Sequence, residues 1–220
     1  MQTAPDTNLL QLNNWTLRTR PATHRPTRLL LLLHGLTGDE NSMWVFARDL
    51  PRHYEMLAPR APHPTQPGGY SWRPFTGEDF GRPTLDQLRP AAEALMQLIA
   101  AYQASAGVEA PEFDVVGFSQ GAAMTSLLSM LYPERIRKIG ILAGFVPAGL
   151  ESVVEQRPLA GKDVFVAHGT KDTTVPVDRA RASIAVLEQA GAHVTYCEDE
   201  VGHKVSLACL QALRHYLTAP

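Results

Sequence analysis

The chain has 220 residues, of which 45% are hydrophobic, and a formal net charge of −2. This length suits one α/β domain, so we expect residues 1–220 to form a single domain around a true core. The 20 Lys and Arg residues form no run, which argues against a nucleic-acid partner. The longest apolar run, Leu29 to Leu33, is far shorter than the roughly 20 residues of a membrane span, so no stable membrane insertion is expected.

The N-terminus and the cysteines indicate where the protein works. The first 14 residues are polar and have no basic segment before an apolar one, so no secretory signal is expected and a cytoplasmic location is predicted. Cys197 and Cys209 do not form a C-x-x-C pair. We expect free thiols, as is usual in a reducing cytoplasm, with a disulfide between the two as the alternative.

The first half of the chain contains three expected strands, at 15–20, 28–33 and 55–58, and an expected helix at 41–50. A long Pro- and Gly-rich loop follows at 59–83. It carries the aromatic residues Tyr70, Trp72 and Phe75. Aromatic side chains are costly to expose in a mere linker, and long loops in compact domains are often functional. We therefore expect this loop to form a wall of a substrate site.

The second half alternates strands and helices. A helix at 84–106 is the clearest element, because Thr84 and Gln87 match a capping box and apolar residues recur at spacings of three and four. The expected elements after it are strands at 113–118, 138–143, 163–167 and 194–198, and helices at 120–132, 177–190 and 205–217. Strands separated by helices require parallel crossovers. The predicted fold class is therefore α/β, with a mostly parallel central sheet and helices on both faces.

A pentapeptide in the middle of the chain, Gly117-Phe118-Ser119-Gln120-Gly121, fits the pattern G-x-S-x-G. It lies between an expected strand and an expected helix, which is the context of a nucleophile elbow. The two glycines allow the sharp turn that raises a serine hydroxyl above the sheet. The pattern therefore predicts Ser119 as a catalytic nucleophile.

A serine hydroxyl needs a base, and in this fold the acid and then the histidine follow the serine along the chain, each in a loop after a strand. His203 lies in the loop between the last expected strand and the last helix. Asp172 is the first carboxylate after the strand at 163–167. We predict His203 as the base and Asp172 as the residue that orients it. Asp178 is a weaker candidate for the acid, because it should already be helical.

An oxyanion hole needs backbone N–H groups near the serine. The pattern predicts one from Gln120, the residue after the nucleophile, and one from the loop after an early buried strand. The loop His34-Gly35-Leu36-Thr37-Gly38 follows such a strand, and Leu36 is the predicted second donor.

Metal-dependent hydrolysis and nucleotide binding are disfavoured, because neither H-E-x-x-H nor a phosphate-binding glycine motif is present.

Four motifs in this order resemble the phospholipase/carboxylesterase family of α/β-hydrolases, which includes the acyl-protein thioesterases. They are His34-Gly-Leu-Thr-Gly38, Gly117-Phe-Ser-Gln-Gly121, His168-Gly-Thr-Lys-Asp172 with Val175-Pro176, and Gly202-His203. The resemblance implies an α/β-hydrolase fold with a minimal cap, a triad of Ser119, Asp172 and His203, and an oxyanion donor at Leu36. It also implies hydrolysis of esters or thioesters without a cofactor, and a possible homodimer.

The chain departs from this family in two places. Gly121 is followed by Ala122 instead of a second glycine, and the tryptophan loop reads Ser71-Trp72-Arg73-Pro74. That loop faces the substrate in the family, so the resemblance carries the chemistry better than the acyl specificity. We expect Trp72 to form a wall of the acyl pocket, with ordinary packing as the alternative, and Thr37 and Phe145 to contact substrate.

The motifs together predict a serine carboxylesterase that forms a covalent acyl-enzyme from a small-molecule ester of small to medium acyl length. A thioesterase or a lysophospholipase of the same family is the alternative. A remote alternative is a non-catalytic receptor with the same fold, which usually lacks a member of the triad.

Overall fold

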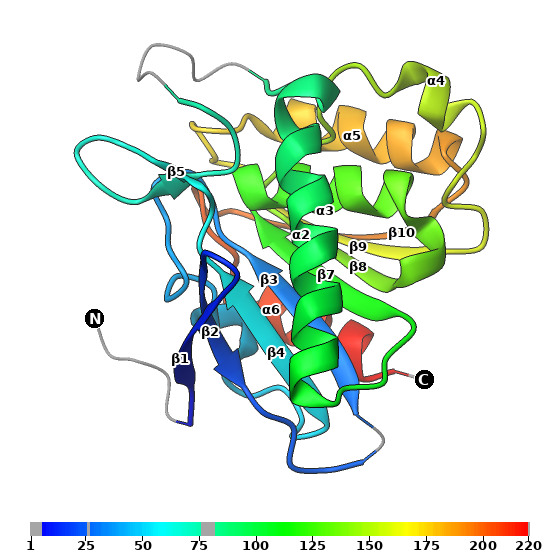
Figure 1. Cartoon of the computed structure of the whole chain (residues 1–220). Helices are drawn as coiled ribbons and strands as arrows, with labels where there is room; N and C mark the ends of the chain where they lie inside the picture. The colour runs from blue at the N-terminus through cyan, green and yellow to red at the C-terminus, as the bar shows by residue number, and fades with distance from the viewer. Residues whose placement is uncertain (1–5, 26, 76–81, 220) are drawn as a thin grey trace.

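A central eight-stranded sheet organises the molecule. The computed structural model describes residues 6–25, 27–75 and 82–219. The strands lie in the order β1-β2-β4-β3-β7-β8-β9-β10, and only β1–β2 and β2–β4 pair antiparallel (Figure 1). Their bounds are β1 (Asn8–Leu12), β2 (Trp15–Arg20), β3 (Arg28–Leu33), β4 (Tyr54–Pro59), β7 (Phe113–Phe118), β8 (Ile136–Leu142), β9 (Asp163–Gly169) and β10 (His193–Asp199). The predicted mostly parallel sheet of the α/β-hydrolase fold is confirmed.

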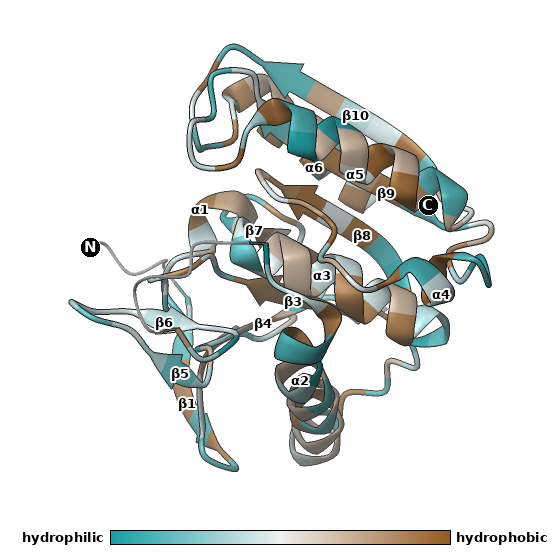
Figure 2. Ribbon diagram, turned by 90° about the horizontal axis from the view of Figure 1, so that it is seen from above, coloured by the Kyte–Doolittle hydropathy of each residue, from teal (hydrophilic) through white to brown (hydrophobic). Residues whose placement is uncertain are grey.

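Helices cover both faces of the sheet, as Figure 2 shows from above. One face packs against α2 (Leu85–Ala106), α3 (Gln120–Leu131), α4 (Glu151–Val154) and α5 (Val177–Gln189), and the other against α1 (Trp44–Ala47) and α6 (Leu207–Thr218). A single 3-10 turn, η1 (Pro133–Arg135), links α3 to β8. The central strands β3, β4, β7, β8 and β9 are mostly buried, which explains why β3 reads as a run of leucines after Arg28.

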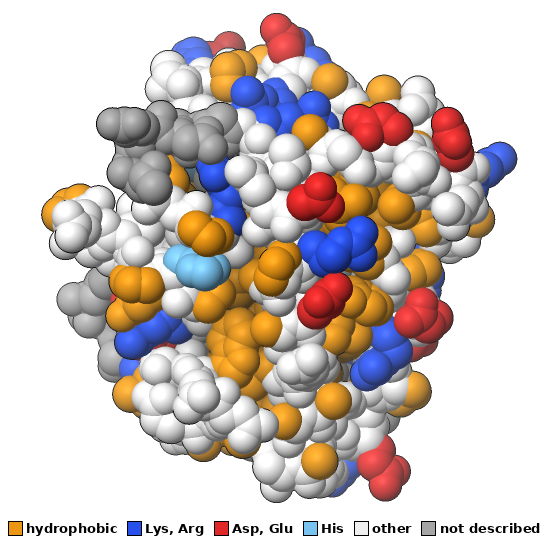
Figure 3. Space-filling model, turned by 45° about the horizontal axis from the view of Figure 1, so that its top comes forward, with side chains coloured by type: hydrophobic (Ala, Val, Ile, Leu, Met, Phe, Trp, Pro, Cys, Tyr) orange, Lys and Arg blue, Asp and Glu red, His pale blue; other side chains and the backbone are white. Residues whose placement is uncertain are grey.

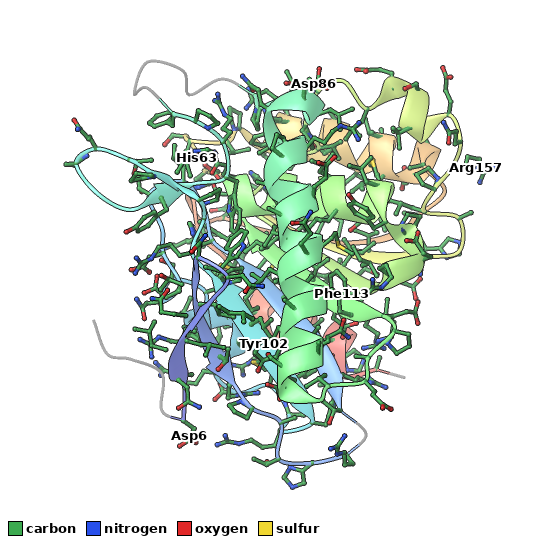
Figure 4. The ribbon with its side chains drawn as sticks, in the orientation of Figure 1. Asp6, His63, Asp86, Tyr102, Phe113 and Arg157 are labelled. Carbon is green, nitrogen blue, oxygen red and sulfur yellow. A yellow bond between two sulfur atoms is a disulfide. The ribbon has the colours of Figure 1, made fainter. Side chains whose placement is uncertain are left out.

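The longest helix begins as the capping box predicts. The Thr84 hydroxyl accepts a hydrogen bond from the Gln87 amide, and the Gln87 side chain accepts one from the Thr84 amide. Gly107 ends the helix in the left-handed conformation, with φ of 63°. In Figure 4, Asp86 at the start of α2 and His63 mark the end of the molecule toward which the parallel strands run, while Tyr102 and Phe113 lie nearer the other end.

Two expectations for the N-terminal third are wrong. The helix expected at 41–50 shrinks to α1, because Asp39 and Ser42 hydrogen-bond each other through side chain and backbone and hold a turn where the helix should begin. The strand expected at 15–20 is not the first of the chain, because β1 precedes it. Asn13 and Asn14, with φ of 46° and 67°, form the tight turn of a β1–β2 hairpin.

The loop expected at 59–83 contains a short antiparallel ribbon of β5 (His63–Pro64) and β6 (Tyr70–Ser71). Tyr70 also pairs with Gly38, so this ribbon is joined to the loop that follows β3. Residues 76–81 of the expected loop lie outside the described residues. The ribbon rises at the end of the molecule where β4 finishes (Figure 1).

The prediction of free thiols is wrong, because Cys197 and Cys209 form a disulfide. The physical reason is that α6 packs back beside β10 and brings Cys209 to the strand that carries Cys197, a contact that sequence spacing does not reveal. The bond closes the loop that carries His203. Disulfides persist in oxidising compartments and are rare in the cytosol, so this bond is unusual for the predicted cytoplasmic location. None of the described helices has the length and apolar character needed to cross a bilayer.

Candidate active site

The predicted site residues follow the carboxyl ends of neighbouring parallel strands. Ser119 comes after β7, Asp172 after β9 and His203 after β10, and the loop of residues 34–38 comes after β3. These strands are adjacent in the order β3-β7-β8-β9-β10. Parallel strands bring their carboxyl ends to one edge of the sheet, and the crevice there is where open α/β sheets bind ligands.

The Ser119 elbow is enforced by close backbone contacts. A Cβ atom on Gly117 would lie 2.1 Å from the Gly121 carbonyl oxygen, and one on Gly121 would lie 2.1 Å from the Leu33 carbonyl oxygen. Only glycine fits at either position. Ser119 itself has φ of 55°, an unfavourable region for a residue with a side chain, and its amide donates to the Leu142 carbonyl at 2.9 Å. The strained turn holds the serine hydroxyl at the start of α3.

The three predicted triad residues form a continuous hydrogen-bonded chain. The Ser119 hydroxyl lies 3.0 Å from Nε2 of His203, and Nδ1 of His203 lies 2.7 Å from Oδ2 of Asp172. With Nδ1 donating to the carboxylate, Nε2 is left as the acceptor for the serine proton. These distances and this order are those of a serine nucleophile, its base and the group that orients the base.

Asp172 is buried and fixed by its other contacts. Its Oδ1 accepts hydrogen bonds from the amides of Thr174 and Val175, each at 2.9 Å. Nε2 of His168 donates to the Val175 carbonyl at 2.8 Å and lies 3.4 Å from Oδ2 of Asp172. The carboxylate therefore has Oδ2 directed at His203 and little freedom to turn away.

Both predicted oxyanion donors, Leu36 and Gln120, line the cavity together with Ser119. Gln120 begins α3, where the first amides have no partner within the helix. The loop that carries Leu36 touches the serine, since a Cβ atom on Gly35 would lie 3.1 Å from Cβ of Ser119. Within the described part of the chain, neither the Leu36 amide nor the Gln120 amide donates to another protein group.

His34 anchors the loop that carries Leu36. The ring is buried; its Nδ1 donates to the Gly35 carbonyl at 2.7 Å, while its Nε2 accepts from the Ala61 amide at 3.0 Å. Burial lowers the pKa of His34 below its usual 6.5, so the ring is held neutral in this role. The amide of Thr37 donates to the Tyr70 carbonyl at 3.0 Å, which ties the loop to β6.

A cavity of about 280 Å³ opens beside Ser119. Six of the predicted site residues line it, namely Leu36, Thr37, Ser119, Gln120, Phe145 and His203, and Asp172 lies behind His203. Five further residues line the cavity and were missed by the sequence analysis, namely Arg73, Pro83, Thr174, Val175 and Arg179. Arg73 and Pro83 belong to the loop at 59–83, in agreement with its expected role as a wall.

Trp72 does not line this cavity, which corrects the expectation of an acyl-pocket wall. Its side chain is fully buried, and its indole N–H donates to the His34 carbonyl at 2.7 Å. Its backbone amide donates to Oε1 of Gln120 at 2.9 Å. The indole is turned inward because its N–H finds a backbone acceptor there, and the neighbouring Arg73 faces the cavity instead.

A second cavity, of about 240 Å³, lies on the other side of the loop at 34–38. Leu36 and Thr37 line both cavities, and the second one is also lined by the apolar residues Met43, Val45, Phe46 and Phe118. The Phe46 and Phe118 rings stack with centroids 5.6 Å apart, and the Phe118 ring lies 5.0 Å from the His203 ring. Ser119 and His203 thus line the first cavity, and the second cavity approaches His203 through the Phe118 ring. Among the described residues, no three His, Cys, Asp or Glu side chains gather as a metal site requires.

The chain matches a known family over most of its length. Residues 16–219 fit the phospholipase/carboxylesterase family. The chain belongs to this family. It is 25% identical over 177 residues to acyl-protein thioesterase 1 of Yarrowia lipolytica. The aligned residues make up 74% of this chain and 77% of the relative. It is 34% identical over 98 residues to carboxylesterase SOBER1 of Arabidopsis thaliana, covering 42% of this chain and 41% of the relative.

A solved structure agrees with this family membership at the level of the fold. The carboxylesterase from Mesorhizobium loti superposes with a TM-score of 0.83 at 23% identity, over 98% of this chain and all of that one. The resemblance stated from the four sequence motifs is confirmed, and the family supports ester hydrolysis.

Proposed function

We propose that this member of the phospholipase/carboxylesterase family is a serine carboxylesterase that acts through a covalent acyl-enzyme. The observation that carries the proposal is the chain of hydrogen bonds from Ser119 through His203 to Asp172, at 3.0 Å and 2.7 Å, on the wall of a cavity. A non-catalytic receptor would have no need of this geometry.

The first step of the proposed reaction forms a bond from the Ser119 oxygen to the ester carbonyl carbon. Nε2 of His203 takes the serine proton and then gives it to the departing alcohol. Asp172 keeps the proton on Nδ1 and stabilises the imidazolium. Water then attacks the acyl-enzyme, with His203 again as the base, and releases the carboxylic acid.

Negative charge develops on the carbonyl oxygen in both steps. The amides of Leu36 and Gln120 are the proposed donors to it, and one such donor contributes about 3 kcal/mol to catalysis. The helix N-terminus at Gln120 adds a favourable partial positive charge.

The cavity beside Ser119 supports small to medium substrates. Its volume of about 280 Å³ is at the small end of ligand pockets. A thioesterase is the second candidate, because a relative that matches three quarters of the chain is named acyl-protein thioesterase 1. The chemistry of the two activities is the same, so only rates on matched esters and thioesters separate them.

The test is hydrolysis of p-nitrophenyl esters from acetyl to palmitoyl, and of matched thioesters, by the native protein and by Ser119→Ala. We expect turnover by the native protein, a preference for short to medium chains, and a loss of roughly 10⁴–10⁶-fold in kcat for the variant. The Ser126→Ala variant is a matched control, because Ser126 lies on α3 with its hydroxyl bonded to the Ala122 carbonyl. A folded native protein that hydrolyses none of these substrates would contradict the proposal.

A further inference from the structure

The far wall of the cavity beside Ser119 carries a cation that is not needed for acyl transfer. Arg179 lies in the first turn of α5, and its guanidinium carbon sits 5.1 Å from the centre of the Phe145 ring. Both residues line the cavity together with Ser119 and His203. Stacking on an aromatic face fixes the position of the guanidinium plane while its N–H groups remain available to a ligand.

The charge of Arg179 has no carboxylate to balance it within ion-pair distance among the residues that the structure describes. Arg181, on the same helix, differs: it pairs with Asp178 at 3.3 Å and with Glu198 at 2.8 Å. The nearest acidic side chain on α5 is therefore engaged elsewhere. Arg179 remains a positive charge on the wall of a cavity.

The surroundings reinforce this positive charge. None of the described residues that line the cavity is acidic. Figure 3 shows Lys and Arg side chains gathered on the upper part of the face that it draws. A cavity with one sign of charge and low-dielectric walls concentrates ligands of the opposite sign.

The second cavity, which shares Leu36 and Thr37 with the first, is mostly apolar. Its lining includes Met43, Val45, Phe46 and Phe118, with no Lys, Arg, Asp or Glu among its described residues. An ester that reached from one cavity to the other past Leu36 and Thr37 would place one end against Arg179 and the other against the rings of Phe46 and Phe118.

We propose that the substrate is an ester that carries an anionic group, a carboxylate or a phosphate, on the part that lies in the Arg179 cavity, and an apolar group on the other side of the ester bond. Arg179 binds the anion and so acts as a specificity residue. A guanidinium fork matches the oxygens of either anion. This inference rests on the proposed esterase function and names its substrate class.

The experiment compares esters that differ only in a distant negative charge. On the acyl side the pair is mono-p-nitrophenyl adipate and p-nitrophenyl hexanoate. On the alcohol side the pair is 4-carboxyphenyl butyrate and its methyl-ester analogue. For each pair the measured quantity is the ratio of kcat/KM for the anionic ester to that for the neutral one, at low ionic strength because salt screens the interaction.

The variants are Arg179→Gln, Arg179→Lys and the control Arg181→Gln, which removes the same charge from the same helix. We expect Arg179→Gln to lower the ratio about tenfold or more in one of the two pairs, mainly through KM, since hydrogen bonds to charged groups are worth about 1.5–3 kcal/mol. Arg179→Lys should restore part of the ratio, and Arg181→Gln should leave it within about twofold, since its charge is already paired at the surface. The responding pair identifies which side of the ester carries the anion.

Failure of the inference is distinct from failure of the proposed function. If the native protein hydrolyses the neutral esters but Arg179→Gln changes neither ratio, the anion site is wrong and the esterase proposal stands. A fall in the ratio that Arg181→Gln reproduces also overturns the site, because the effect would then come from net charge. If no ester is hydrolysed by the folded native protein, the esterase proposal itself fails and the inference falls with it.

Discussion

Ser119 and His203 reach the cavity from two very different supports. Ser119 is held by a turn whose glycines touch backbone on both sides, and α3 behind it is buried from Gln120 to Met130. His203 lies in a loop between β10 and α6, and its side chain is 23% exposed. The position of Ser119 is thus fixed by buried backbone around it, whereas His203 lies in a partly exposed loop.

Three contacts compensate for the weaker support of the histidine loop. The amides of Thr170 and Lys171 donate to the Asp199 and Val201 carbonyls at 2.8 and 3.0 Å, so the loops after β9 and β10 are joined. The bond from His203 to Asp172 is the second contact, and the disulfide across the base of the loop is the third. Ser119 and His203 must both be positioned precisely for catalysis. Close packing positions Ser119, whereas hydrogen bonds between loops and a disulfide position His203.

Among the contacts that support the histidine loop, the largest expected effect comes from the hydrogen bond between His203 and Asp172. Asp172→Asn should lower kcat about 10⁴-fold, because the amide nitrogen cannot accept a hydrogen bond from the Nδ1–H group and the imidazole is left in the wrong tautomer. The fold should persist, since the remaining amide oxygen can still accept from Thr174 and Val175. The measurement is kcat on a p-nitrophenyl ester together with a thermal melt.

The control is Asp178→Asn, at the weaker candidate for the acid. Asp178 is an exposed partner of Arg181, so its variant should remain within about twofold of the native kcat. A loss of less than a hundredfold in Asp172→Asn would remove Asp172 from the proposed triad.

An alanine scan of two glycines tests the difference in packing directly. Gly121→Ala places a Cβ atom 2.1 Å from the Leu33 carbonyl oxygen, so the free energy of unfolding should fall by about 3 kcal/mol. Gly202→Ala places its Cβ atom 3.8 Å from the nearest group, the Lys171 carbonyl oxygen, and should change stability by about 0.5 kcal/mol or less. Chemical denaturation measures both, and equal losses would mean that the two supports do not differ as described.

Removal of the disulfide tests the third contact of the histidine loop. The double variant Cys197→Ala/Cys209→Ala should lose about 2–3 kcal/mol in the free energy of unfolding, as loop closure predicts for a bond of this span. We expect a fall of a few-fold in kcat as well, because the loop that carries the base loses its closure. A reductant should lower the melting temperature of the native protein but leave that of the double variant unchanged. If both respond alike, the bond does not support the loop.

Much of the fold and of the triad could be predicted because their signals are local. The strands at Phe113–Phe118 and Arg28–Leu33 have the predicted bounds, since a buried strand is read from a continuous apolar run. The geometry brings Ser119, Asp172 and His203 together as the order of loops implied. The β1–β2 hairpin was missed although its two asparagines carry a turn signal.

The cavity walls could not be predicted, because they depend on how distant loops meet. The orientation of Trp72 is decided by a hydrogen bond to the His34 carbonyl, and that of Arg179 by the Phe145 ring. The disulfide depends on the path of α6 across the sheet. The cytoplasmic location and the homodimer stay predictions.

The Gln120 side chain has a consequence for any attempt to redesign this protein. Its Oε1 accepts from the Trp72 amide, and its Nε2 donates to the Ser71 hydroxyl, while its own backbone amide is a proposed oxyanion donor. Two hydrogen bonds therefore couple the position of Gln120, the residue after the nucleophile, to the position of the segment Ser71-Trp72. A loop transplanted from a relative without a matching partner for Gln120 would disturb the residue next to Ser119. We therefore expect changes of selectivity to be better tolerated at Arg179 and Phe145, which line the cavity from α5 and from the segment after β8.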